Sequence, residues 1–158
     1  SVCGGEVGAQ AKWNNGLGAR ITYAYTKEQL AKDKDGNSIN NQYIPAREHA
    51  LNVRMDYDRQ ISSNYGLNIG LQGRVLSGVE NEEYKDYYDV SKGTISVEYP
   101  AYTLWKLSLV QRIGKAVKVN AALDNLFGYK PKYYYLNSPI TDGVTFQVGV
   151  SIDIDKFF

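Results

Sequence analysis

The sequence V-T-F-Q-V-G-V-S-I-D-I-D at residues 144–155 decides the fold class. Apolar residues alternate with polar or small residues throughout this segment. Because neighbouring side chains of a β-strand point to opposite faces, the segment predicts a strand with one apolar and one polar face.

Six other segments show the same alternation, at residues 7–13, 17–26, 51–58, 65–75, 104–110 and 117–124. In the fifth of these six, Leu104 and Val110 blur the pattern and leave the facing of the strand open. The composition, with 14 Tyr and 15 Gly beside one Met, favours strands and tight turns over helices. We therefore expect an all-β protein.

The connections between these segments alternate in length. Short turns lie at residues 14–16, 61–64 and 114–115, and long polar connections lie at residues 28–47, 78–100 and 125–143. Outer-membrane barrels have short periplasmic turns and long extracellular loops. We expect an antiparallel up-and-down transmembrane β-barrel segment of about seven strands. Because seven strands cannot close such a barrel, residues 1–158 are expected to be the C-terminal portion of a larger barrel domain.

Several motifs carry a family resemblance over nearly the whole chain. They are G-G-E-V-G-A-Q-A-K-W at residues 4–13, N-N-G-L-G-A-R-I-T-Y-A-Y-T at 14–26, I-P-A-R-E-H-A-L-N-V at 44–53 and V-K-V-N-A-A-L-D-N-L-F at 117–127. The N-L-F of Asn125, Leu126 and Phe127 is the most specific part, and the final strand ends in Phe158. Together these segments resemble the C-terminal strands of TonB-dependent outer-membrane receptors.

The resemblance implies a barrel of twenty-two strands in the bacterial outer membrane, filled by an N-terminal plug domain that is absent from these residues. It further implies import of a scarce nutrient such as a ferric siderophore, haem or cobalamin. The expected partners are outer-membrane lipid and lipopolysaccharide, the rest of the barrel, the nutrient ligand, and TonB acting through the plug.

Two other kinds of protein stay open at this point. A small complete outer-membrane barrel with a structural or adhesive role would need an even number of strands, with one more strand within residues 80–100. A soluble β-sandwich binding module would show the same alternation.

Enzymatic and nucleic-acid functions are not expected. The single histidine, His49, has no motif that pairs it with a nucleophile such as Ser62, Ser63 or Ser77. The net charge of +1 gives no field that would attract nucleic acid. We predict no cofactor and no metal site. His49 is interpreted either as an interfacial residue at a strand start or as a ligand of haem iron, and Cys3 has no intrachain partner.

Candidate ligand contacts are of two kinds. Polar residues on the water-facing side of the strands would line the lumen, and tyrosines in the long connections would offer flat surfaces with a polar tip. The first kind comprises Gln72, Arg74, Lys106 and Asn120, and the second comprises Tyr84, Tyr87, Tyr88, Tyr133, Tyr134 and Tyr135.

Overall fold

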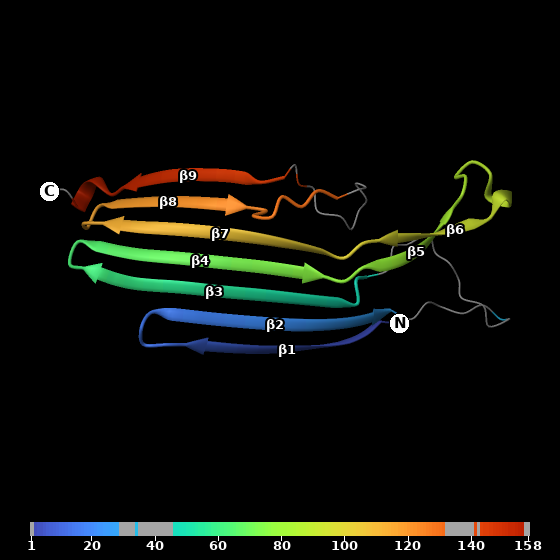
Figure 1. The fold of residues 1–158 in the computed structure, drawn as a ribbon, viewed down its shortest axis with the longest axis horizontal. Helices are drawn as coiled ribbons and strands as arrows, with labels where there is room; N and C mark the ends of the chain where they lie inside the picture. Colours follow the sequence, from blue (N-terminus) through green and yellow to red (C-terminus); the bar gives the residue numbers. More distant parts are fainter. Residues whose placement is uncertain (1, 29–33, 35–45, 132–140, 142, 157–158) are drawn as a thin grey trace.

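A computed structural model describes residues 2–28, 34, 46–131, 141 and 143–156. Seven strands form one antiparallel sheet, in the order β1-β2-β3-β4-β7-β8-β9 (Figure 1). These strands are β1 (Val2–Lys12), β2 (Leu17–Glu28), β3 (His49–Ser62), β4 (Tyr65–Leu76), β7 (Tyr102–Ile113), β8 (Val117–Asp124) and β9 (Thr145–Ile152). The seven predicted strands are thereby confirmed, as is their antiparallel up-and-down order.

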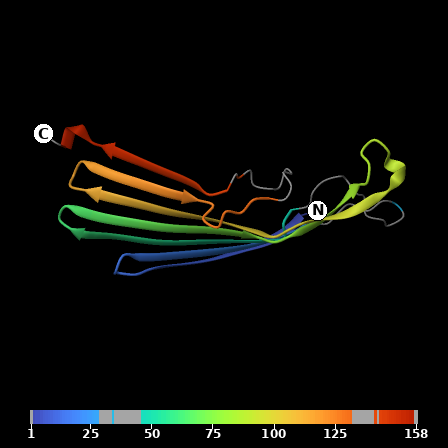
Figure 2. The ribbon, with the colours of Figure 1, turned by 45° about the horizontal axis from the view of Figure 1, so that its top comes forward.

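The three short turns lie together at one end of the sheet (Figure 1). The first is closed by the Gly16 amide, which donates to the Trp13 carbonyl at 3.1 Å, and Gly16 has φ of +94°. A Cβ at position 16 would lie 2.3 Å from the Asp58 carbonyl oxygen, so glycine is required there by both the backbone angle and the close approach. Seen obliquely, the sheet is twisted rather than flat (Figure 2), and its strands stay paired up to this end.

Strand alternation gives the sheet two different faces. The face that carries Arg20, Arg54, Gln72 and Lys106, which the strand pairings place side by side, is called the polar face below. The opposite face is called the apolar face, and its exposed side chains include Ile21, Met55, Ile69, Leu107 and Val148.

The apolar face has no second layer packed against it in the described part of the chain. Met55 and Val148 are 44% and 60% exposed, and the hydrophobic side chains that are buried among the described residues are Leu76, at the end of β4, and Tyr99, shortly before β7. Leaving large apolar side chains in water costs about 25 cal/mol per Å². An extended apolar face on a curved antiparallel sheet is therefore typical of a surface that lipid covers.

The connection at residues 78–100 differs from the expected loop. It forms two further strands, β5 (Val79–Tyr84) and β6 (Thr94–Tyr99), joined through the short 3-10 helix η1 (Val90–Lys92). This hairpin makes a separate two-stranded sheet and projects beyond the end opposite the short turns (Figure 1). The small-barrel alternative required one more strand in the main sheet. The hairpin adds no strand to the seven-stranded sheet.

The two outer strands each have one neighbour among the described residues. All eleven residues of β1 are exposed, and seven of the eight residues of β9 are exposed. The chain turns into a second 3-10 helix, η2 (Ile154–Lys156), before the predicted alternation ends. Unpaired strand edges of this length readily pair with further strands. In the described part of the chain, no helix is long and apolar enough to cross a membrane.

Candidate functional site

The polar face carries a hollow of about 470 Å³. Its position is set by one row of residues that the strand pairings align across five neighbouring strands: Arg20, Arg54, Gln72, Lys106 and Asp124. Neighbouring strands lie about 4.8 Å apart, so side chains in such a row are neighbours. Thr22, Asn52, Arg74, Leu104, Asn125 and Thr141 complete the polar and apolar lining, together with parts of Val53, Gly73 and Trp105.

Three of the predicted lumenal residues lie at this hollow, and one does not. Gln72, Arg74 and Lys106 line it. Asn120 shares the polar face but pairs with Val110 and Gly149, nearer the short turns.

Several residues that line the hollow were not predicted to contact a ligand, among them Arg20, Asn52, Arg54 and Asp124. The signal was present, because each stands at a polar position in the alternation. What was missing was the register between strands, which decides the residues that meet.

The positively charged side chains that line the hollow differ in whether a carboxylate lies close enough to balance their charge. Lys106 forms an ion pair of 3.0 Å with Asp124. Arg20 donates to the neutral Gln10 amide oxygen at 3.0 Å, and the Arg54 Nε lies 3.9 Å from an Asp56 carboxylate oxygen, at the limit of an ion pair. Arg74 has no hydrogen-bond or ion-pair partner among the described residues.

Arg47 lies at the end of the polar face next to the β5–β6 hairpin and contacts several residues there. Its guanidinium donates to the carbonyl oxygens of Ser77 and, at 2.8 Å, of Pro100, which are the residues where the β5–β6 hairpin leaves and rejoins the sheet. The guanidinium lies 4.7 Å from the centroid of the Tyr102 ring, and Tyr102 stacks on Tyr129 at 5.2 Å. Burial raises the pKa of the Tyr129 phenol, and the charge of Arg47 opposes this.

Asn125 holds the connection after β8. It is buried, it has φ of +53°, and its amide group donates to the Tyr129 carbonyl oxygen at 2.7 Å and to the Thr141 hydroxyl at 2.9 Å. Its own Oδ1 accepts from the Tyr129 amide at 2.9 Å. The structure thus gives a physical role to the first residue of the N-L-F motif, because asparagine tolerates positive φ and can satisfy both backbone groups.

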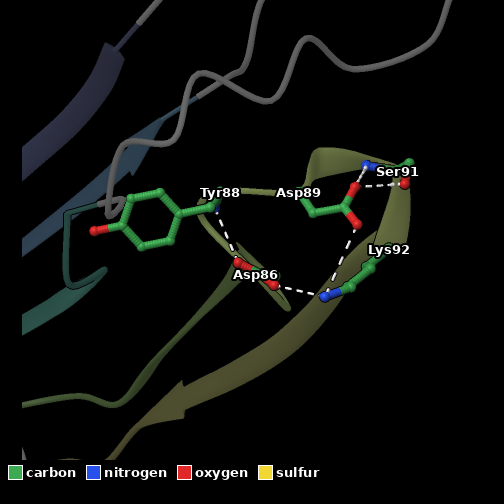
Figure 3. Close-up of polar contacts among 5 residues, drawn as sticks. All are labelled: Asp86, Tyr88, Asp89, Ser91 and Lys92. Carbon is green, nitrogen blue, oxygen red and sulfur yellow. Dashed lines mark hydrogen bonds and ion pairs between the residues drawn. The ribbon is translucent and has the colours of Figure 1, made fainter.

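The tip of the β5–β6 hairpin is ordered by local polar contacts (Figure 3). Lys92 forms an ion pair of 2.6 Å with Asp86, and Asp89 accepts from the Ser91 amide and hydroxyl at 3.2 and 2.5 Å. The Asp86 carboxylate also accepts from the Tyr88 amide at 3.0 Å. The hydrogen bond from Lys92 and then that from the Tyr88 amide lower the pKa of Asp86.

The predicted tyrosine contacts are divided by this hairpin. Tyr87 and Tyr88 stand at the tip, 69% and 101% exposed, whereas Tyr84 is half-buried at the end of β5. Tyr133, Tyr134 and Tyr135 lie outside the described residues. The hairpin tip and the hollow are therefore separate candidate contact regions.

His49 begins β3 on the apolar face. Its Nδ1 lies 2.7 Å from the Tyr23 hydroxyl, and its ring is 5.2 Å from that of Tyr25. This position agrees with the interfacial interpretation and puts the imidazole on the face opposite the hollow. Near the same end, Phe127 approaches Trp105 edge to face at 6.2 Å. Aromatic residues at strand ends on the lipid side are typical of membrane barrels.

An open antiparallel sheet with an apolar face, a hollowed polar face, short turns at one end and an ordered hairpin at the other is typical of the wall of a β-barrel. A family model described as the TonB dependent receptor-like beta-barrel matches residues 4–126. The chain belongs to this family. A search of curated proteins found no match.

Proposed function

We propose that this chain is the C-terminal wall of a bacterial outer-membrane receptor that imports a scarce nutrient, such as a ferric siderophore, haem or cobalamin. The observation that carries the proposal is the two-faced sheet. One face presents apolar side chains toward lipid, and the other presents Arg54, Gln72 and Lys106 toward an aqueous lumen. Membership of the TonB-dependent receptor family supports the same conclusion.

The proposal assigns two roles to the polar side. Gln72, Arg74 and Lys106 contact the nutrient, or the groups that surround it, as it passes the hollow. Tyr87 and Tyr88 meet the nutrient outside the membrane, because the hairpin extends from the end of the sheet opposite the short turns and leaves both rings exposed (Figure 1). Lipopolysaccharide and phospholipid cover the apolar face.

Uptake measurements on the intact receptor test this function. Cells that lack the receptor gene are compared with their parent for uptake of haemin, ferric citrate, a ferric hydroxamate chelate and cyanocobalamin. We expect uptake of one of these compounds to fall in the receptor deletion and to fall equally when TonB is deleted. Unchanged uptake of all four compounds, under conditions in which the receptor is expressed, would count against import of these nutrient classes.

Two variants separate the role of the hairpin tip from that of the hollow. Tyr87→Ala with Tyr88→Ala should weaken capture of the nutrient and raise the concentration needed for half-maximal uptake. Gln72→Ala should lower the rate of uptake at saturating nutrient. Identical uptake curves for the parent and both variants would remove these residues from the pathway.

A further inference from the structure

Two arginines face one another directly in the wall of the hollow. Arg20 and Arg54 are paired residues on β2 and β3, and both side chains stand on the polar face. Like charges in directly opposite positions of a sheet destabilise it. The nearest carboxylate is Asp56, 3.9 Å from the Arg54 Nε, and both of these side chains are more than a third exposed. The repulsion is therefore poorly compensated within the described residues.

The excess of positive charge continues along the hollow. Of the described residues that line it, four are cationic, namely Arg20, Arg54, Arg74 and Lys106, and one is a carboxylate, Asp124. Asp124 is already paired with Lys106 at 3.0 Å. The remaining three cations are all arginines. A guanidinium presents a planar fork of donors that matches a carboxylate or a phosphate in two parallel hydrogen bonds.

The rest of the lining suits a small ligand. Thr22, Asn52 and Gln72 supply neutral donors and acceptors beside the arginines, and Leu104 supplies an apolar surface. A volume of about 470 Å³ lies within the range of sites that bind small molecules, about 300 to 1,000 Å³.

We propose that this hollow is a site for a small polyanion, in which Arg20 and Arg54 together grip one carboxylate or phosphate group and Arg74 binds a second. The inference rests on the proposed function and narrows it, because the nutrient that passes this wall then carries at least two negative charges. The paired arginines act as the recognition element, and their mutual repulsion in the empty site is relieved when the anion binds.

Binding to the purified intact receptor, without transport, tests the inference. Isothermal titration uses citrate as the carboxylate probe and pyrophosphate as the phosphate probe, at low ionic strength. We expect binding of at least one probe, and a loss of affinity of about tenfold or more in Arg20→Gln with Arg54→Gln. The matched control is Lys118→Gln, which removes one exposed cation from the polar face outside the hollow and should leave affinity unchanged.

A conservative double variant separates the effect of the planar guanidinium groups from the effect of their positive charge. Arg20→Lys with Arg54→Lys keeps both charges but removes the forks, and should show an affinity between those of the parent and the glutamine variant. Because the glutamine variant relieves a repulsion, its folding is expected to be at least as robust as that of the parent, as judged by heat-modifiable gel mobility.

Two outcomes overturn the inference. One is that neither probe binds the intact receptor; the other is that the glutamine variant and Lys118→Gln bind the probes equally well. Uptake of a neutral nutrient in a TonB-dependent manner, combined with either outcome, would leave the proposed function standing while removing the anion site. If cells that express the parent receptor show no TonB-dependent uptake of any nutrient, that result would instead count against the proposed function.

Discussion

The Arg47 guanidinium lies 4.7 Å from the centroid of the Tyr102 ring while it donates to the Pro100 carbonyl oxygen at 2.8 Å. The same guanidinium also donates to the Ser77 carbonyl oxygen. One side chain therefore joins both ends of the β5–β6 hairpin to the aromatic rim of the sheet. The hairpin is therefore attached to the sheet at the two points where the chain enters and leaves it.

Replacing Arg47 should loosen the hairpin neck. Arg47→Ala removes hydrogen bonds from a charged group and a cation–π contact, together worth about 2 kcal/mol. Amide hydrogen exchange in β5 and β6 should become faster by about tenfold or more, with Arg47→Lys intermediate. The control is Arg112→Gln, which breaks the ion pair of 2.7 Å with Asp58 near the short turns and should leave exchange in the hairpin unchanged. Equal effects of both changes would contradict a local role for Arg47.

Replacing Asn125 should destabilise the protein for two reasons that different variants can separate. Asn125→Ala removes the amide group and places alanine at φ of +53°, so we expect a loss of about 1 to 3 kcal/mol in the free energy of unfolding. Asn125→Gly keeps the backbone angle free of strain and removes only the hydrogen bonds. Denaturant titration of the refolded receptor in lipid vesicles should place the glycine variant between the alanine variant and the parent. A glycine variant as unstable as the alanine variant would show that positive φ contributes nothing.

The hairpin tip should depend on pH through Asp86. Its pKa is lowered, chiefly by the hydrogen bond from Lys92, so the stabilisation is present above the ordinary value of 3.8 and is lost as pH falls through the lower folded-state pKa. The contacts in Figure 3 should therefore persist when the pH falls to the ordinary value of 3.8, and should disappear only as the pH falls through the lower pKa of folded Asp86. Carbon NMR of labelled aspartate, assigned with Asp86→Asn, measures this titration. A midpoint at or above 3.8 would argue against the Lys92 contact.

The two faces of β9 should respond oppositely to charge. Val148 is 60% exposed on the apolar face, and its neighbour Gln147 stands on the polar face. Val148→Arg should cost about 2 to 4 kcal/mol in the assembly of the intact barrel if it lies near the bilayer midplane, whereas Gln147→Arg should be tolerated far better. Heat-modifiable gel mobility and the amount of receptor in outer membranes provide the readout. Equal tolerance of the two changes would refute the assignment of faces.

The strands could be predicted because alternation is a local property of the sequence. The alternation within residues 144–155 alone predicts which side chains lie on each face, without information from any other part of the chain. The strand at residues 104–110 was harder to interpret because Leu104 and Val110 both stand on the polar face, opposite Arg74 and Asn68 respectively. Apolar residues in a lumen break the local rule, and only the pairing with neighbouring strands resolves them.

The β5–β6 hairpin and the pairing of Arg20 with Arg54 could not be predicted from the local sequence pattern, for two different reasons. The β5–β6 segment is rich in charge, so its alternation of Ile95, Val97 and Tyr99 with polar residues was hidden in a polar connection. Arg20 and Arg54 are opposite each other only because β2 and β3 pair in one register, across a long connection that does not fix it. Alternation predicts the face of each residue, whereas register determines its neighbours.

Spin labels on adjacent residues test directly whether the apolar face lies against lipid and the polar face against water. Cys3, the single cysteine and exposed, is first replaced by serine, and labels are then attached through Leu71→Cys and Gln72→Cys in the intact receptor in lipid. We expect the label at 71 to relax with dissolved oxygen, which concentrates in lipid, and the label at 72 to respond to a water-soluble nickel reagent. A label at 71 that responds to the nickel reagent as strongly as the label at 72 would contradict a lipid-facing sheet.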